Sequence, residues 1–322
     1  MFAQANRRKL FNRSWSLMVM AVLLSALVIM SVGGCTAKKE AKTFQSAEEA
    51  VEAMIDAVSQ DDTQELMAIF GSEGEKVISS GDEVADKAGR ERFVQAYKEM
   101  NKLVRETDTK VTLLVGTEAW PFPIPIVKEG ETWRFDTAAG AEELLNRRIG
   151  RNELNTIQVC LAYVDAQREY ALKDRDGDGK LNYARQVIST EGKKDGLYWE
   201  AGEGEAQSPL GPLAAKAAEA GYKARKSGEK PQPYYGYYYK ILTAQGENAP
   251  GGAYDYVVTG NMIGGFALVA YPAEYGNAGV MSFMVNHEGV VYQKDLGKGT
   301  AKKAKKMKLF DPDETWEEVG EQ

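Results

Sequence analysis

The sequence predicts an α+β protein in which helices precede strands twice along the chain. Apolar residues recur at helical spacing early in the chain and again over residues 141–172. Runs rich in β-branched and aromatic residues, bounded by Gly and Pro, occupy residues 110–138 and 234–295. The apolar content of 43% is typical of a globular protein with a substantial core. These three observations predict two domains, each with helices beside an antiparallel sheet.

The first 34 residues have a different composition from the rest. Four basic residues precede an uncharged apolar run from Leu17 to Val32, and Gly-Gly-Cys follows. The run is shorter than the roughly 20 residues that span a bilayer. A basic start, an apolar run and small residues in this order predict a secretory signal peptide over residues 1–34.

The end of this signal, "VGGC", resembles a bacterial lipobox, in which small residues precede a cysteine that is acylated and becomes the mature N-terminus. The resemblance implies that Cys35 carries lipid and that residues 35–43 form a tether to the membrane. A signal peptide with a chance cysteine is the alternative. Because Thr36 is not Asp, the resemblance to sorted lipoproteins implies the periplasmic side of the outer membrane in a host with two membranes.

The mature chain would be strongly acidic. Loss of residues 1–34 removes four basic residues and changes the net charge from −7 to −11, which argues against nucleic acid as a partner. The one basic cluster, at residues 302–308, is predicted to be a solvated helix face. With Cys35 lipidated, Cys160 has no disulfide partner, and its apolar helical neighbours place it in the core.

Residues 44–140 are predicted to form the N-terminal α+β domain. Ser46 and Glu49 form a capping box at the start of its first helix. A second short helix lies within Asp62–Gly71, and a third covers about 88–104. The strands follow, and three prolines confine the middle one to an edge or an irregular strand. The order of these elements resembles small domains of the cystatin or ketosteroid-isomerase type.

Residues 141–316 are predicted to form a long helix, a variable loop and an antiparallel β-meander. The meander starts at "PYYGYYYKIL", and "NHEG" is a four-residue turn that exposes His287. This order resembles the globular part of type II pilins and pseudopilins. The segment "YPAEYGNAGVMSFMVNHEGVVYQKDLG" of this chain matches the final hairpin of those proteins. Here a whole domain precedes the helix and the anchor would be lipid, which argues against polymerisation of the pilus kind.

The mature chain also resembles one family of uncharacterised bacterial proteins, domain-of-unknown-function family 2950. The resemblance extends over about residues 44–316. Its matching segments include "WPFPIPIVKEGETWRFDTAAGAEELLNRRIGRNEL", "SPLGPLAAKAA", "PYYGYYYKIL" and "GGFALVAYPAEYG". The resemblance brings no known activity with it.

The stretch "KDRDGDGKLNYAR" resembles an EF-hand calcium loop, but Arg185 stands where the bidentate Glu is required. Because calcium needs about six to eight oxygen ligands, the loop alone is incomplete. A weak calcium site would use Asp174, Asp176, Asp178, Lys180 and Asn182. The alternative is an acidic, glycine-rich turn after a helix. Calcium is the one cofactor that the sequence suggests.

Catalytic motifs are scarce. The chain has one histidine, too few for a zinc site with two or three imidazoles, and no P-loop, dinucleotide fingerprint or G-x-S-x-G motif. Glu142, Glu143 and Glu153 are the carboxylates that a histidine-independent glycan hydrolase would use. The alternative is a charged helix face in which Glu143 pairs with Arg147 four residues later.

Aromatic side chains supply the remaining functional signal. A groove for glycan or peptide would use Trp120, Tyr198, Trp199, Tyr235, Tyr237 and Tyr239. Packing of these residues in the core is the alternative. The sequence thus favours a non-enzymatic binding or scaffold lipoprotein of the cell envelope that contacts other envelope proteins or cell-wall polymer. A hydrolase acting on cell-wall glycan is the alternative.

Overall fold

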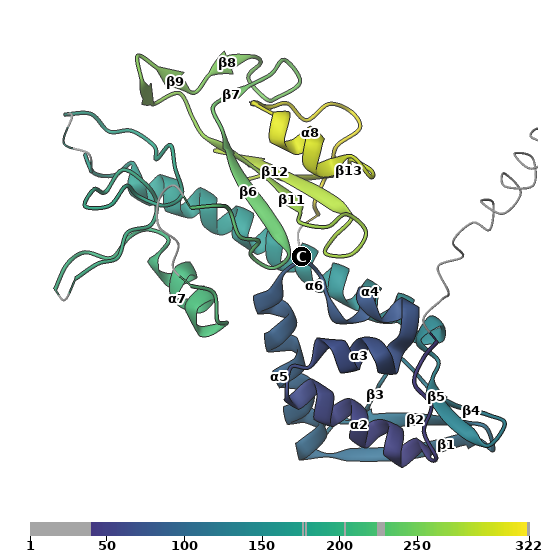
Figure 1. Cartoon of the computed structure of the whole chain (residues 1–322). Helices are drawn as coiled ribbons and strands as arrows, with labels where there is room; N and C mark the ends of the chain where they lie inside the picture. The colour runs from purple at the N-terminus through teal and green to yellow at the C-terminus, as the bar shows by residue number, and fades with distance from the viewer. Residues whose placement is uncertain (1–39, 176, 178, 203, 224–228, 321–322) are drawn as a thin grey trace, which may run out of the picture. The chain divides into compact units, whose positions relative to one another are not determined.

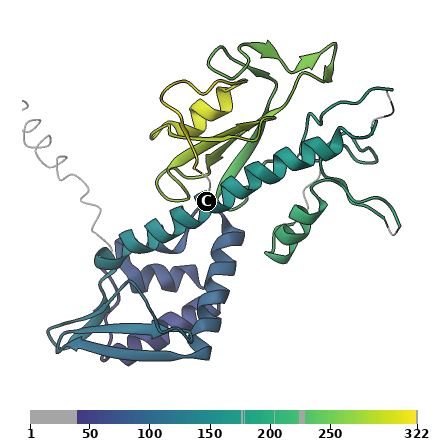
Figure 2. The ribbon, with the colours of Figure 1, turned by 180° about the vertical axis from the view of Figure 1, so that it is seen from behind.

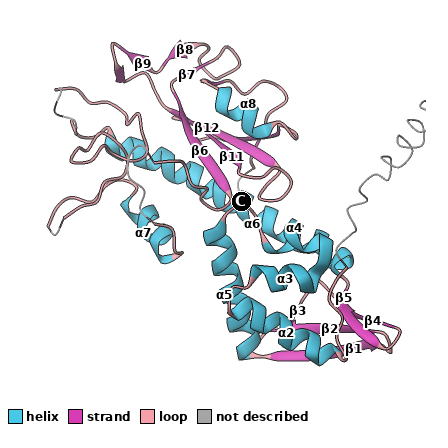
Figure 3. Cartoon of the chain, in the orientation of Figure 1, coloured by secondary structure: helices cyan, strands magenta, loops and turns pink. Residues whose placement is uncertain are grey.

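The computed structural model describes residues 40–175, 177, 179–202, 204–223 and 229–320 (Figure 1). The predicted signal peptide and Cys35 lie outside these residues, and so do Asp176 and Asp178 of the predicted calcium loop. Helices and mainly antiparallel sheets occupy separate regions of the described chain, which confirms the α+β class (Figure 3).

Helices open the folded region, as the sequence predicts. They are α2 (Ala47–Ser59), α3 (Thr63–Phe70), the 3-10 turn η1 (Gly71–Glu73), α4 (Gly74–Ile78) and α5 (Glu83–Glu99). The Ser46 hydroxyl accepts a hydrogen bond from the Glu49 amide at 3.0 Å, and Asp62 caps α3 by accepting two backbone N–H groups. Gly71 ends α3 with φ +68°, a conformation that favours glycine. These local signals are confirmed.

The first sheet follows α5. Its strands are β1 (Asn101–Thr107), β2 (Lys110–Val115), β3 (Trp120–Pro121), β4 (Ile126–Glu129) and β5 (Thr132–Phe135), in the order β1-β2-β4-β5 with β3 beside β2. The middle segment with the prolines is irregular, as predicted. The predicted helix over 88–104 is wrong at its end, because Met100 is extended and β1 begins at Asn101. Antiparallel pairing with β2 outweighs the helical spacing there.

The first hydrophobic core lies between these helices and the first sheet. Its fully buried members include Met54, Leu66, Ile69, Leu113, Ile124, Ile126 and Phe135. The long helix α6 (Thr137–Tyr170) begins against this core. The Thr137 hydroxyl donates to the Phe70 carbonyl at 2.9 Å, and a Cβ at Gly140 would collide with the backbone of Pro123. The small residue at this position lets α6 approach the chain before β4 closely.

The second sheet is the predicted meander. Strands β6 (Tyr237–Leu242), β11 (Ala267–Pro272), β12 (Met281–Asn286), β13 (Val291–Asp295) and β15 (Glu317–Glu318) pair antiparallel in the order β15-β13-β12-β11-β6. The short strands β7 (Ala244–Gln245), β8 (Tyr254–Asp255), β9 (Val257–Val258), β10 (Asn261–Met262) and β14 (Leu309–Phe310) form two small sheets. Two further helices are α7 (Gly211–Glu219) and α8 (Thr300–Lys306). The lysines of α8 are exposed, as predicted for the basic cluster at residues 302–308.

The second core lies between α6 and this sheet. Figures 1 and 2 show α6 running from the first helical region to the second sheet. From Ile157 onward, the buried face of α6 joins a cluster that includes residues 267–270 of β11. Cys160 is 0% exposed, and burial raises the pKa of its thiol to about 12. The predicted core position of Cys160 is therefore confirmed.

Arg148 connects α6 to two distant segments. Its guanidinium donates to the carbonyls of Lys76, Val77 and Ser79 at the end of α4. It also donates to Oδ1 of Asn277 at 2.6 Å, and Asn277 in turn donates to Ser79 at 2.9 Å. The last carbonyls of a helix lack partners within the helix, so a charged donor is well placed here.

Asp82 makes the second connection of this kind. One oxygen caps α5 by accepting the Ala85 amide. The other accepts the Gly236 amide at 2.8 Å and the Tyr222 hydroxyl at 2.7 Å. Because Asp82 is buried, these neutral donors replace the water that its carboxylate would otherwise bind. The start of α5 is thereby fixed to the turn before β6.

We expect Arg148→Ala to lower the free energy of unfolding by about 2–4 kcal/mol, because several partly buried carbonyls lose a charged donor. Urea denaturation of the chain measures this. Arg147→Ala is the matched control, since Arg147 makes one exposed ion pair with Glu143 that contributes about 0–1 kcal/mol. Equal effects of the two substitutions would contradict the role given to Arg148.

Candidate functional site

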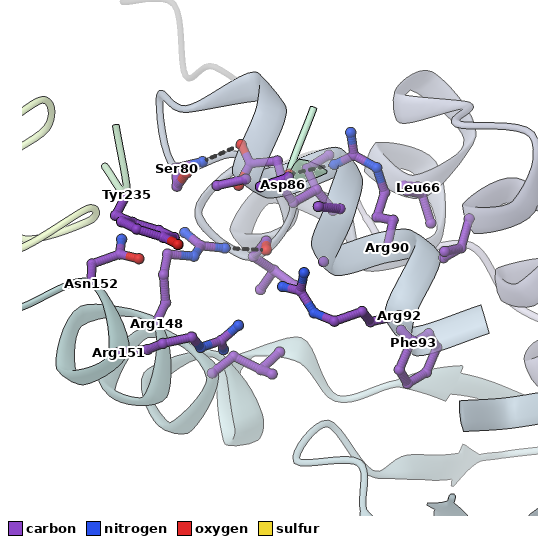
Figure 4. A pocket seen from close by; sticks show the side chains of 18 of the residues that line it. Leu66, Ser80, Asp86, Arg90, Arg92, Phe93, Arg148, Arg151, Asn152 and Tyr235 are labelled. Carbon is purple, nitrogen blue, oxygen red and sulfur yellow. Dashed lines mark hydrogen bonds between the residues drawn. The ribbon is translucent and has the colours of Figure 1, made fainter. Parts of the chain in front are cut away.

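A cavity of about 370 Å³ lies among α5, α6 and the ends of the neighbouring helices (Figure 4). Its apolar wall consists of Met54, Val58, Leu66, Phe70, Val77, Ile78, Phe93, Phe122 and Leu144. Its polar lining includes Ser80, Asp86, Arg90, Arg92, Arg148, Arg151, Asn152, Asn155, Tyr222 and Tyr235. The volume falls in the range of about 300–1,000 Å³ that is usual for small-molecule sites.

Two of the four arginines are held by other parts of the protein. The Arg90 guanidinium is 2.6 Å from the Asp61 carboxylate and also donates to the Ile78 carbonyl at 3.1 Å. Arg148 donates to the carbonyls at the end of α4, as described above. Both side chains therefore have structural roles that occupy their donors.

Arg92 and Arg151 are different. Neither makes a hydrogen bond or an ion pair with any residue in the part of the chain that the structure describes. Figure 4 shows them projecting toward each other from α5 and α6. Burial lowers the pKa of Arg151, and the positive charge of Arg92 lowers it further. An arginine remains protonated despite such shifts, so two positive charges face the cavity without an acid to neutralise them.

Asp86 is the one carboxylate among the residues that line the cavity. Burial raises its pKa, although hydrogen bonds from Ser80 and the nearby charges of Arg148 and Arg90 oppose this effect. The Ser80 amide donates to it at 2.8 Å. Asp86 thus lies near Arg90 and Arg148, which already have partners. It does not neutralise the positive charges of Arg92 and Arg151.

This arrangement offers donors that suit an anion, and its lining residues lack the parts for covalent catalysis. A guanidinium presents a planar set of donors that matches a carboxylate or phosphate group. His, Cys and Lys are absent from the residues lining the cavity, and Ser80 is buried beside Asp86. No nucleophile with an adjacent base is present among these lining residues.

The carboxylates considered for a hydrolase do not converge. Glu142 and Glu143 lie near the start of α6, and Glu143 forms the predicted pair with Arg147 at 2.6 Å. Glu153 accepts the backbone amides of Val280 and Met281, each at 2.9 Å. Ten residues of helix separate Glu143 from Glu153 by about 15 Å, at a rise of about 1.5 Å per residue. Paired glycosidase carboxylates lie about 5–9.5 Å apart.

The aromatic residues predicted for a groove occupy four different environments. Tyr235 lines the arginine cavity, whereas Tyr198 and Tyr239 line a second cavity of about 290 Å³. Trp199 and Tyr237 are buried in the second core. Trp120 is 57% exposed on β3 and lines neither cavity. The structure therefore brings only Tyr198 and Tyr239 of this set to one cavity.

The predicted calcium loop is described only in part. Asp174 accepts the backbone amides of Gly177 and Gly179 at 2.8 and 2.9 Å. Lys180 is exposed and Asn182 is buried, while Asp176 and Asp178 lie outside the described residues. The calcium site remains a prediction.

The expected exposure of His287 is wrong. The side chain is half-buried, with its ring edge-on to Tyr256 at 5.8 Å and to Phe266 at 6.1 Å. Its Nδ1 atom is buried, and no hydrogen-bond partner for it exists among the described residues. The segment containing β8 to β10 covers the turn, which a local turn pattern cannot reveal. His287 does not line the arginine cavity.

Sequence reasoning missed the arginine cavity itself. It assigned the arginines of "AEELLNRRIGRNEL" to a charged helix face. One usable signal was the spacing of Arg148, Arg151 and Asn155, which places three donors at successive turns on one side of a helix. The facing Arg92 comes from α5, and only tertiary structure brings the two helices together.

The chain is an α+β protein with an arginine-lined cavity, and the residues that line this cavity include no catalytic set. The chain belongs to a family of unknown function, because the family model described as "Protein of unknown function (DUF2950)" matches residues 41–319. This match confirms the resemblance found in the sequence. No curated protein and no solved structure matches the chain.

The likeness to cystatin-type domains and to pilin globular domains remains a prediction. Across the described residues, no helix combines the length and the apolar content that crossing a membrane requires.

We expect Arg151→Gln to raise the free energy of unfolding by less than about 0.5 kcal/mol, because water screens the repulsion between exposed charges. The substitution removes a charge that Arg92 repels. Denaturation at low and high salt measures this, and the gain should shrink as salt screens the repulsion. The exposed control Arg147→Gln should give no gain, and a loss of stability in Arg151→Gln would refute the explanation.

Proposed function

We propose that this chain is a non-enzymatic binding lipoprotein of the cell envelope that holds an anionic small molecule in the arginine cavity. The single observation that carries the proposal is the pair Arg92 and Arg151, two guanidiniums that have no partner among the described residues and lie beside an apolar wall. The positive charge of Arg92 disfavours the charged form of Arg151. An anion between them would remove that cost.

The envelope location rests on the sequence. The order of basic residues, apolar run and "VGGC" supports export and acylation of Cys35. A lipid on Cys35 would make the membrane a partner and place the cavity near envelope proteins and cell-wall polymer. Calcium bound by the Asp174 loop would be a structural addition to this role.

A binding function is favoured over the alternative of glycan hydrolysis. Glu153 is occupied by two backbone amides, and Glu143 by Arg147. The separation of about 15 Å along one helix leaves no room for these carboxylates to act on one glycosidic bond. Asp86, the carboxylate of the cavity, has no second carboxylate among the lining residues.

Inorganic phosphate tests the anion site directly. We expect the melting temperature of the protein to rise with phosphate at constant ionic strength, because binding to the folded state adds stability by mass action. The double variant Arg92→Gln/Arg151→Gln should lose this dependence, and Arg147→Gln should keep it. An equal rise in the double variant would overturn the proposal.

The anchor is tested separately. We expect Cys35→Ala to abolish acylation and leave residues 1–34 attached, because the residue that is acylated and becomes the mature N-terminus is lost. Mass spectrometry of the native protein should show an acylated N-terminus at Cys35. An intact, unmodified Met1 in a cytosolic fraction would contradict the predicted location.

A further inference from the structure

We propose that the ligand of the arginine cavity is an amphiphile with a phosphate-monoester head and an apolar body. This inference rests on the anion site proposed above and names the class of molecule that the site takes. It follows from the charge at the mouth of the cavity, the apolar wall behind it and the volume between them.

The charge of the cavity matches a dianion. Arg90 is neutralised by Asp61, and Arg148 donates to carbonyls and lies near Asp86. Arg92 and Arg151 remain with two positive charges. A phosphate monoester carries about −1.5 to −2 at pH 7, whereas a carboxylate carries one negative charge. The monoester therefore balances the pair, and its three free oxygens can accept from both guanidiniums.

The position of the two arginines indicates how such a ligand lies. Arg92 and Arg151 are themselves exposed, which places them at the mouth of the cavity. Asn155 follows Arg151 by four residues on the same side of α6 and also lines the cavity, so its amide can donate to the same head group. The head would lie at the opening, with water on one side.

The wall behind these arginines is apolar. Six of its side chains are only partly buried and stand at the edge of the first core: Val58, Val77, Ile78, Phe93, Phe122 and Leu144. The rings of Phe93 and Phe122 pack with centroids 5.3 Å apart. Apolar surface that the protein leaves open inside a cavity gains free energy when a hydrocarbon covers it. An anion without an apolar part would leave this wall exposed.

The volume limits what enters. About 370 Å³ corresponds to roughly 12 water-sized groups at about 30 Å³ each. A phosphate group uses five non-hydrogen atoms, which leaves room for about seven carbons, or about eight when part of the head group lies in the water at the opening. A longer chain would have to extend through the opening. Octyl phosphate is therefore the probe that fits head, wall and volume together.

Calorimetric titration of the full chain with octyl phosphate, inorganic phosphate, octanoate and octanol tests the inference. We expect octyl phosphate to bind at least tenfold more tightly than each of the other three. Arg92→Gln and Arg151→Gln should each weaken octyl phosphate about tenfold or more while affecting octanol little. Arg147→Gln should leave all four unchanged, and circular dichroism and melting confirm that the variants fold.

The apolar wall has its own variant. Leu144→Ala shortens a partly buried side chain on α6, so it should weaken octyl phosphate and leave inorganic phosphate unchanged. Equal losses for both probes would indicate a folding defect and contradict the wall's role. A loss of affinity for octyl phosphate but not for inorganic phosphate would distinguish a residue of the apolar wall from one that only stabilises the fold.

The outcomes separate this inference from the proposed function. If octanoate binds as tightly as octyl phosphate, the phosphate head is wrong and an anion site remains. If octyl phosphate binds no more tightly than inorganic phosphate, the ligand is not an amphiphile, and the proposed anion site is still supported. If no anionic probe binds, both the inference and the proposed function fail.

An experiment with lipid vesicles distinguishes a membrane lipid from a soluble phosphate ester as the ligand. A chain that begins at residue 36, and so lacks both the apolar run of residues 17–32 and the lipid anchor, is mixed with phosphatidylcholine vesicles with or without phosphatidic acid and separated by flotation. Flotation only with phosphatidic acid, lost in Arg92→Gln/Arg151→Gln, identifies a membrane lipid. Binding of octyl phosphate without flotation identifies a soluble ester. Failure of both arms overturns the inference.

Discussion

The structure depends on the hydrogen bonds that the Arg148 guanidinium donates. Helix α4 ends in carbonyls that its own backbone cannot pair, and this guanidinium donates to three residues there while also holding Asn277. A partly buried cation deprived of such acceptors would cost several kcal/mol. Segments far apart in the chain are therefore positioned together by one side chain. Asp82 does the same for the start of α5 and the turn before β6. The arginine cavity lies among the elements that these two contacts fix.

The same residue type serves two opposite purposes within this cavity. Arg90 and Arg148 are paired and stabilise the fold, whereas Arg92 and Arg151 repel each other and have no partner in the described part of the chain. Natural proteins tolerate such local costs where a ligand or a reaction benefits from them. The unpaired arginines also stand against an apolar wall, so the cavity offers charge at its mouth and hydrocarbon-like surface behind it. A ligand with both characters satisfies the two surfaces at once.

The charge of the whole chain sharpens this selectivity. The protein is acidic, with a net charge of −7, so large polyanions are repelled at long range. Four arginines nevertheless line one cavity of about 370 Å³. For the proposed small anion, repulsion from the acidic surface and attraction inside the cavity would act together, a combination that specific sites commonly use. An acylated N-terminus at Cys35 would bring this cavity to a membrane surface, where amphiphiles are concentrated.

The features that local chemistry controls could be predicted from the sequence. The caps at Ser46 and Asp62, the stop at Gly71 and the irregular proline segment follow from chemistry within a few residues. The runs of β-branched and aromatic residues predicted the antiparallel meander. The sequence also determined the α+β class, because the two hydrophobic periods are local. It could not determine that β1 replaces the end of a helix, that His287 is covered, or that Arg148 and Arg151 differ in role from Arg147. The Arg148 contact with Asn277 joins residues 129 positions apart, and Arg92 meets Arg151 only across two helices. Tertiary structure decided the site because charge becomes a binding feature only when packing determines which charges find partners.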